Sequence, residues 1–390
     1  MSRKLLAPFR LPAWRIDHRS TGGANVSIGH SFNMSTNHTR RKSKQQRLAD
    51  FIIGSGTLPG FRVLHDRGRT PVLILAYHRI VSVDEPQTYP LDLGLISATR
   101  DEFDSQMRAV REFANPVSLD TIADAVTRGG TLPERAVAVT FDDGFRDTFE
   151  AALPILKRHA VPATVFVSTD FIESNEPFWF EITAHLMLRI PPRAIVFDEC
   201  PEGLPSADDP AARRESIGKL HRLLKTCANP RRRALVEEWR VRFAHLIDAR
   251  ADDLSRPIAK AQILDMSRDG IDFGSHTVSH PNLALESTDV IERELRNSRT
   301  CLELLLEKPV RSLAYPFGTP DTYDARVMKA AHACGYELAA SFRQGVNWLG
   351  ALEPMELRRI GIGPGVTTTQ FRAMLALPAW LHPHLRHDHT

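Results

Sequence analysis

The sequence predicts an α/β fold in which parallel strands alternate with helices and close into a barrel. Apolar segments typical of buried strands alternate with amphipathic helical segments about seven times along the chain, which favours parallel β/α units. In addition, polar or aromatic residues directly follow the carboxyl ends of several predicted strands: His78, Asp142, Asp143, His276 and Phe317. In a β/α barrel, this end of the strands carries the functional residues.

The predicted strands are short, apolar and without helical spacing. The first covers 72–77 and is followed by His78, and the central one covers 137–141 and is followed by Asp142. Both contain the β-branched residues that favour strands. The other predicted strands share this character and lie at 117–118, 163–167, 270–273, 312–315, 338–340 and 357–360.

The predicted helices are recognised by their starts and their apolar faces. Thr99 and Glu102 have the spacing of a capping box, and Phe103, Met107 and Val110 follow on one helical face. Further helices are predicted at 148–159, 289–307 and 323–334.

Composition divides the chain into a folded domain and two terminal segments. Residues 1–47 are basic and polar without apolar periodicity, so we expect a disordered tail. The folded domain is predicted at 48–370 and a C-terminal tail at 371–390. At about 172–260 a basic, helical insertion interrupts the β/α alternation. It either borders a substrate groove or has structural duties only.

Charge and composition argue against several classes of function. The net charge of the 390 residues is only +3, so the sequence does not predict a nucleic-acid partner. No apolar run reaches the roughly 20 residues of a transmembrane helix, and no secretory signal is evident. We therefore expect a cytoplasmic location, with peripheral association of the basic tail with a membrane left open. The four cysteines form no Cys-x-x-Cys pair. The sequence does not predict an oligomeric state.

Two adjacent carboxylates, Asp142 and Asp143, follow the central strand. Buried carboxylates repel each other, and a cation would relieve that repulsion. Taken alone, the motif is better explained as a helix N-cap. His276 and His280, however, have a spacing that can aim two imidazoles at one point. With Asp143 they offer two nitrogens and one oxygen and leave a position for water, which is the ligand count of a catalytic zinc site.

These motifs resemble those of the polysaccharide deacetylases, also called the NodB-homology domain or carbohydrate esterase family 4. The stretches at 140–144 and 276–280 look like the first two family motifs, and 314–318 looks like the third. The resemblance covers about 72–362 and is closest to the branch with an early Tyr-His element, here Tyr77-His78. It implies a distorted (β/α)7 TIM-like barrel with a helical insertion.

The resemblance also implies an activity and roles for the site residues. A metal-dependent hydrolase would remove N-acetyl groups from a glycan containing N-acetylhexosamine. Asp143, His276 and His280 would hold a divalent metal, most simply Zn²⁺. Asp142 would act as the base, although the sequence alone does not separate the roles of the two aspartates. His78 would orient or protonate the substrate, or it is a hydrogen-bonded core residue.

The third motif is expected to bind the oxyanion and the substrate. A backbone N–H near Tyr315, Pro316 and Phe317 would stabilise the oxyanion. Tyr315 or Phe317 would stack on a sugar ring, or these rings are core aromatics at a strand end.

The sequence departs from the family pattern in two places. Ala314 stands where many members have an arginine that braces the base, so another arginine would have to serve instead; the candidates are Arg311, Arg343, Arg358 and Arg359. A late Asp and a late Leu-x-His motif are also missing. Two alternatives therefore stay open: a noncatalytic carbohydrate-binding relative, and a deformylase or O-deacetylase that uses the same metal site.

Overall fold

A closed barrel of parallel strands organises the protein, which the computed structural model describes at residues 70–190, 194–198, 200–201, 203–204 and 209–376. The predicted tail at 1–47 lies outside these residues. The ring runs β1-β11-β9-β8-β7-β6-β5 and closes from β5 to β1. Its seven strands are β1 (Pro71–Tyr77), β5 (Ala136–Phe141), β6 (Ala163–Val167), β7 (Asp272–Ser275), β8 (Ser312–Ala314), β9 (Leu338–Gln344) and β11 (Leu357–Gly361). The predicted (β/α)7 barrel is confirmed.

Short strands flank the barrel. β10 (Asn347–Trp348) pairs antiparallel with β1, and β4 (Asn115–Pro116) pairs with the start of β5. A separate two-stranded sheet joins β2 (Arg79–Ile80) and β3 (Ile96–Ala98). The strand predicted at 117–118 ends two residues earlier than expected, because Ser118 caps the next helix by accepting the Thr121 N–H at 3.1 Å.

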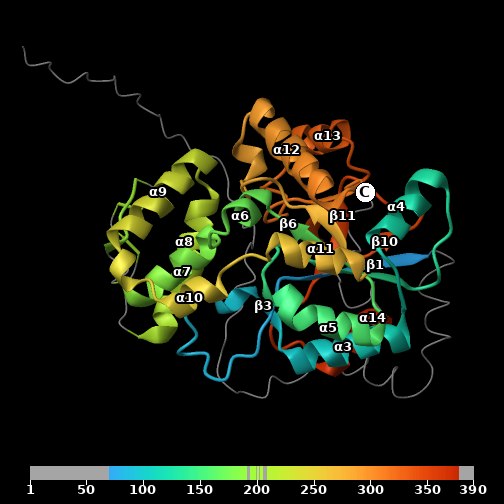
Figure 1. Ribbon diagram of the computed structural model, residues 1–390, viewed down its shortest axis with the longest axis horizontal. Coiled ribbons are helices and arrows are strands. Elements are labelled where there is room, and N and C mark those ends of the chain that lie inside the picture. The colour runs from blue at the N-terminus through green and yellow to red at the C-terminus, as the bar shows by residue number, and fades with distance from the viewer. Residues whose placement is uncertain (1–69, 191–193, 199, 202, 205–208, 377–390) are drawn as a thin grey trace, which may run out of the picture. The chain divides into compact units, whose positions relative to one another are not determined.

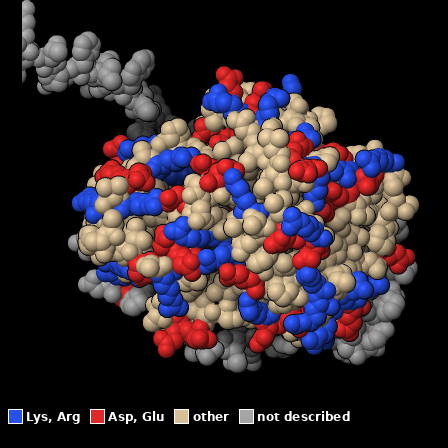
Figure 2. Space-filling view, viewed as in Figure 1, with Lys and Arg blue, Asp and Glu red and all other residues tan. Residues whose placement is uncertain are grey.

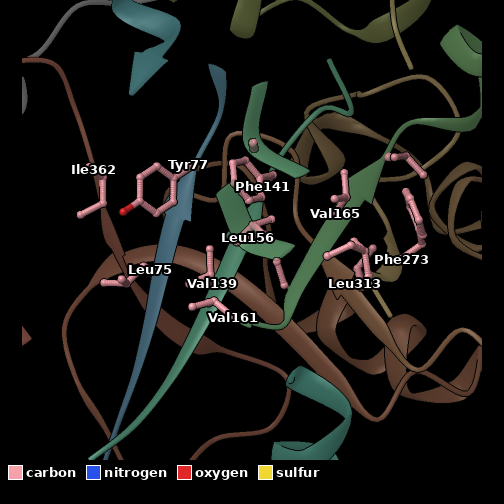
Figure 3. Packing of buried hydrophobic residues seen from close by; sticks show 14 of the residues in the cluster. Leu75, Tyr77, Val139, Phe141, Leu156, Val161, Val165, Phe273, Leu313 and Ile362 are labelled. Atoms are coloured by element: carbon pink, nitrogen blue, oxygen red, sulfur yellow. The ribbon is translucent and has the colours of Figure 1, made fainter. Parts of the chain in front are cut away.

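Barrel residues alternate between two apolar clusters. In β1, Val72 and Ile74 belong to an inner cluster, whereas Leu73, Leu75 and Tyr77 pack beneath the surrounding helices. The same alternation recurs in β5, where the inner positions are alanines and the outer ones are Val139 and Phe141, seen in Figure 3. Strands buried on both faces explain the continuous apolar runs in the sequence.

Helices surround the strands (Figure 1). They are α3 (Arg100–Phe113), α4 (Leu119–Arg128), α5 (Leu153–His159), α6 (Thr169–Ser174), α11 (Lys260–Arg268), α12 (Thr288–Leu306), α13 (Ala325–Ala333) and α14 (Thr368–Ala376). The capping box predicted for α3 is present, since Thr99 and Glu102 exchange hydrogen bonds of 3.2 and 2.8 Å. The helix predicted at 148–159 begins with a π-helical turn, Thr148–Ala152, before α5.

Besides α6 and α11, the described chain has four further α-helices between β6 and β7, which lie beside the barrel in Figure 1. They are α7 (Trp179–Arg189), α8 (Pro210–Lys225), α9 (Asn229–Arg242) and α10 (Ala249–Leu254). α7, α8 and α9 share an apolar core of their own, which Phe145 joins from the barrel, whereas Ala251 of α10 belongs to a separate apolar cluster. The buried Arg79 ties the two parts together, since its guanidinium donates to Asp147 at 2.9 Å and to Glu181 at 2.6 Å.

The carboxyl end of the described chain packs against the barrel domain. Phe371 and Leu375 of α14 are buried in the outer cluster, and α14 lies against α3. The boundary predicted at 370 divides this helix, so we propose that the domain extends through Ala376. Within the described residues, no helix has the length and apolar character that crossing a membrane requires.

Candidate active site

Asp143, His276 and His280 meet at the carboxyl end of the barrel. Asp143 follows β5 and both histidines lie in the loop after β7. The nearest Asp143 oxygen lies 3.5 Å from His276 Nε2 and 3.3 Å from His280 Nε2, and all three side chains are buried. One ligand atom from each residue lies within 4.8 Å of the others. We call these three residues the Asp-His-His cluster.

Unusual backbone geometry aims these side chains. Asp143, Thr277 and His280 have φ angles of 71°, 68° and 54°, in the left-handed region that non-glycine residues rarely adopt. Each such residue costs on the order of 1–3 kcal/mol, and such strain concentrates at functional sites. Gly144 completes the turn at φ 84°, and a Cβ there would lie 2.7 Å from Val167 Cγ1. The loops are therefore shaped to bring the ligand atoms together.

The protonation of the cluster suits a cation. His276 Nδ1 lies 2.8 Å from the Ala314 carbonyl and donates to it, which directs Nε2 toward Asp143; loss of the Nε2 proton would make this nitrogen a metal ligand. Burial lowers the pKa of His280 to about 4, so its ring is neutral. Although burial opposes it, hydrogen bonds from both histidines hold the pKa of Asp143 below its ordinary value. An ionised carboxylate and free imidazole nitrogens are the donor set that a divalent metal requires.

His276 is the exception that supports this interpretation. Burial opposes its charged form, but the neighbouring Asp143 and Asp142 carboxylates raise its pKa above the ordinary value. The positive charge of a protonated His276 would thus offset the negative charges of the two carboxylates. A bound cation would replace this proton.

Asp142 forms a buried, bidentate ion pair with Arg359. The two guanidinium–carboxylate distances are 2.6 and 2.8 Å, and both side chains are buried. Burial raises the pKa of Asp142, but Arg359 and His276 outweigh it, so the pKa lies below its ordinary value. Among the four arginines considered from the sequence, Arg359 is therefore the one that braces this carboxylate. Arg311 pairs with Glu337 and Asp124, and Arg343 pairs with Glu356.

The predicted third motif contributes one side chain to the site. Tyr315 is fully buried, donates its hydroxyl to the Met355 carbonyl at 2.9 Å, and stacks on Tyr323. Its position matches the core aromatic considered as the alternative. The physical reason is strand alternation: Leu313 and Tyr315 face the outer cluster, whereas Ala314 faces inward.

Phe317 does not follow this alternation, because its φ angle of 61° lies in the left-handed region and not in that of an extended strand. Its ring lies 4.7 Å from the His280 ring, centroid to centroid. The Tyr315 N–H donates to the Ala340 carbonyl, and Pro316 has no N–H. Within the described residues the Phe317 N–H has no acceptor, which makes it the available donor of this motif.

A cavity of about 360 Å³ opens onto the cluster. His78 lies in its wall, as do Asp142, Phe317 and the Asp-His-His cluster. The centroids of the His78 and Phe342 rings lie 5.6 Å apart, and the backbone N–H of His78 donates to Ser97 Oγ at 2.9 Å. The structure thus brings together every site residue predicted from the sequence except Tyr315 and Pro316.

The insertion contributes residues that the sequence does not single out. α8 supplies Gly218, His221, Arg222 and Lys225 to the cavity wall. Behind the cavity, the buried Arg232 of α9 donates to the His280 carbonyl at 2.8 Å. These residues lie in a basic helical segment where most arginines face solvent, so no sequence pattern distinguishes them.

Comparisons with known proteins agree with this geometry. A family model described as polysaccharide deacetylase matches residues 129–339. The chain is 20% identical over 310 residues to YxkH of Bacillus subtilis, whose assignment as a polysaccharide deacetylase is itself provisional; the match covers 77% of this chain and 75% of that protein. It is 28% identical over 115 residues to the poly-β-1,6-N-acetyl-D-glucosamine N-deacetylase of Staphylococcus epidermidis, over 27% of this chain and 39% of that protein.

Solved structures share the fold. The Streptococcus pyogenes deacetylase PplD, in complex with acetate, aligns with a TM-score of 0.52 at 21% identity, over 77% of this chain and 96% of that one. IcaB from Ammonifex degensii aligns with a TM-score of 0.50 at 18% identity, over 79% of this chain and 97% of that one. At these sequence identities, the structural similarity shows a shared fold and no more.

Proposed function

The chain belongs to the polysaccharide deacetylase family, and from this premise we propose that it is a metal-dependent hydrolase of N-acetyl groups on a glycan containing N-acetylhexosamine. The observation that carries the proposal is the Asp-His-His cluster beside Asp142 on one cavity wall. The name of the Staphylococcus epidermidis relative supports an N-acetylglucosamine substrate.

Asp143, His276 and His280 would hold the metal, most simply Zn²⁺, because two imidazoles and one carboxylate leave a coordination position open. When bound, such an ion polarises a carbonyl and lowers the pKa of water to about 7. This chemistry suits an acetamide, whose carbonyl is a poor electrophile toward neutral water.

Asp142 is the proposed general base. It is ionised, buried and fixed by two hydrogen bonds from Arg359, so its oxygens are preorganised to accept a proton from water. Arg359 is a positioning residue, since it acts on the reaction through Asp142.

Two further roles are a donor that stabilises the oxyanion and an acid that protonates the leaving amine. The Phe317 N–H is the proposed donor to the oxyanion, because it is the free amide of the third motif. His78 is the proposed acid that protonates the leaving amine, since it lines the cavity and the other imidazole of the wall outside the cluster, His221, lies against Asp92.

The direct test is acetate release from N-acetylated chito-oligomers and from poly-β-1,6-N-acetylglucosamine. We expect release that stops on chelation and returns on addition of zinc. Binding of the oligomers without release would indicate a noncatalytic carbohydrate-binding protein. Release of formate from a formylated sugar, or of acetate only from O-acetylated glycans, would retain the metal site but change the leaving group.

Replacing Arg359 with Met should raise the pKa of Asp142, because burial would then be uncompensated. The acidic limb of the kcat/KM pH profile should move to higher pH, since the base stays protonated over a wider range. Loss of one partner of a buried pair should also cost about 3 kcal/mol of stability, measurable by urea denaturation. Arg359→Lys retains the charge and should show a smaller shift. An unchanged pH profile in Arg359→Met would remove Asp142 as the group that sets this limb.

Replacing Arg232 with Met should weaken zinc affinity by about tenfold, the lower range for residues that orient metal ligands. The reason is that Arg232 holds the carbonyl of His280, whose φ angle of 54° needs support. Zinc affinity is measured by competition with a chromophoric chelator. The matched control is Arg233→Met, because the neighbouring Arg233 pairs with Asp170 at the surface. Equal zinc affinities of the two variants would contradict the role of Arg232.

A further inference from the structure

One face of α8 forms part of the cavity wall. Gly218, His221, Arg222 and Lys225 all line the cavity. Gly218 and Lys225 each lie three or four residues from both His221 and Arg222, which places the four residues on one side of the helix. Because the Asp-His-His cluster lines the same cavity, a sugar bound at the cluster would lie within reach of this helix face.

Every carboxylate in the cavity wall already has a partner. Asp142 is paired with Arg359. Asp143 is paired with the two histidines of the cluster. Asp92 lies 3.4 Å from Nδ1 of His221. None of these carboxylates forms an ion pair with Arg222 or Lys225.

Arg222 and Lys225, by contrast, have no ion pair with any residue that the structure describes. Elsewhere on the molecule, basic and acidic side chains are interspersed, as Figure 2 shows for one face. Lys225 is partly buried, and its Nζ lies 4.6 Å from the centroid of the Phe317 ring. Burial lowers its pKa and outweighs the attraction of the Asp92, Asp143 and Asp321 carboxylates, none of which forms an ion pair with it. Two unpaired cations in one wall of a cavity call for an anionic partner from outside the chain.

The position of Lys225 relates this charge to the reaction site. The Phe317 ring that carries the Lys225 ammonium on one side contacts the His280 ring, with centroids 4.7 Å apart. One aromatic ring therefore separates the cation from the Asp-His-His cluster. A group attached to the acetylated sugar, rather than the acetamide itself, would meet Arg222 and Lys225.

We propose that Arg222 and Lys225 form an anion subsite and that the substrate carries a carboxylate or phosphate group next to its acetylated sugar. The proposal rests on the proposed function, because it assumes that an N-acetylated sugar binds at the cluster. A guanidinium and an ammonium are suited to this chemistry, since both donate charge-assisted hydrogen bonds to anionic oxygens.

The test compares the binding of three probes to the full chain in the presence of zinc, by isothermal titration calorimetry. The probes are N-acetylglucosamine, its 1-phosphate, and a disaccharide of N-acetylglucosamine and glucuronic acid. We expect at least one anionic probe to bind about tenfold or more tightly than the neutral sugar. The preferred probe identifies whether phosphate or carboxylate is the natural group. In the double variant Arg222→Met, Lys225→Met this ratio should fall to near one.

The matched control is Lys219→Met, since Lys219 of the same helix pairs with Glu215 instead of lining the cavity. It should keep the preference for the anionic probe. Should the double variant fail to fold, the two single variants replace it, each with a reduced ratio. Equal binding of all three probes by the wild type, or a preference that survives in the double variant, overturns the subsite.

Acetate release from neutral chito-oligomers by the same preparations separates the two proposals. Release without any preference for an anionic probe overturns the subsite and leaves the deacetylase function in place. Failure to release acetate from any N-acetylated glycan, together with failure to bind zinc, overturns the proposed function itself.

Discussion

Asp142→Asn is expected to lower turnover of an N-acetylated oligomer by about a hundredfold or more while the protein keeps its metal. Asparagine has nearly the same size as aspartate, but its amide cannot take a proton from water. Asp142 is not one of the three residues whose ligand atoms converge, and both of its oxygens accept hydrogen bonds from Arg359, at 2.6 and 2.8 Å. Steady-state acetate release and elemental analysis of the same preparation measure the two effects.

A folding control accompanies this variant, because the neutral amide leaves the buried Arg359 charge unbalanced. The free energy of unfolding should fall, and urea denaturation shows whether the protein is folded at the assay temperature. The Arg359→Met variant serves as the matched comparison, since it breaks the same ion pair from the other side but retains the carboxylate. Turnover close to that of the wild type in a folded, metal-replete Asp142→Asn variant would move the base elsewhere.

The fold follows from the sequence because a parallel barrel buries both faces of each strand. β1 is buried along its whole length, so its run of apolar residues is continuous. Residues that follow the strands, such as His78 and His276, line one cavity because the carboxyl ends of parallel strands meet at the same end of the barrel. The short β2 and β3 pair was not predicted, since two- and three-residue strands carry too little periodicity.

Strand alternation explains what the sequence leaves undecided about the site. Leu357 and Arg359 share the inner face of β11, so alternation excludes Arg358 but does not reveal that Asp142 follows β5, the second strand from β11 in the ring. The contact joins residues 217 positions apart. The proposed anion subsite could not be predicted for a similar reason. Lys225 and Lys219 belong to one helix, and only the packing of α8 places Lys225 in the cavity wall and leaves Lys219 paired with Glu215.

Removing both histidines of the cluster, in His276→Ala, His280→Ala, should abolish metal binding. The wild type should hold about one equivalent of zinc, as three protein ligands imply. A single carboxylate remains in the double variant, and one oxygen ligand holds zinc poorly in water. Elemental analysis after dialysis measures the loss. A full equivalent of zinc in the folded double variant would place the metal outside the cluster.

Asp143→Asn separates the ligand role from the base role. A neutral amide is a weak ligand, so zinc affinity should fall first, and excess zinc should restore part of the acetate release. The same excess should leave Asp142→Asn inactive, because that variant lacks a proton acceptor rather than a metal. The distinction rests on geometry, since Asp143 faces both histidines at 3.5 and 3.3 Å whereas Asp142 faces Arg359. Rescue of Asp142→Asn instead of Asp143→Asn would exchange the two roles, and acetate release unaffected by either change would locate the reaction in another part of the protein.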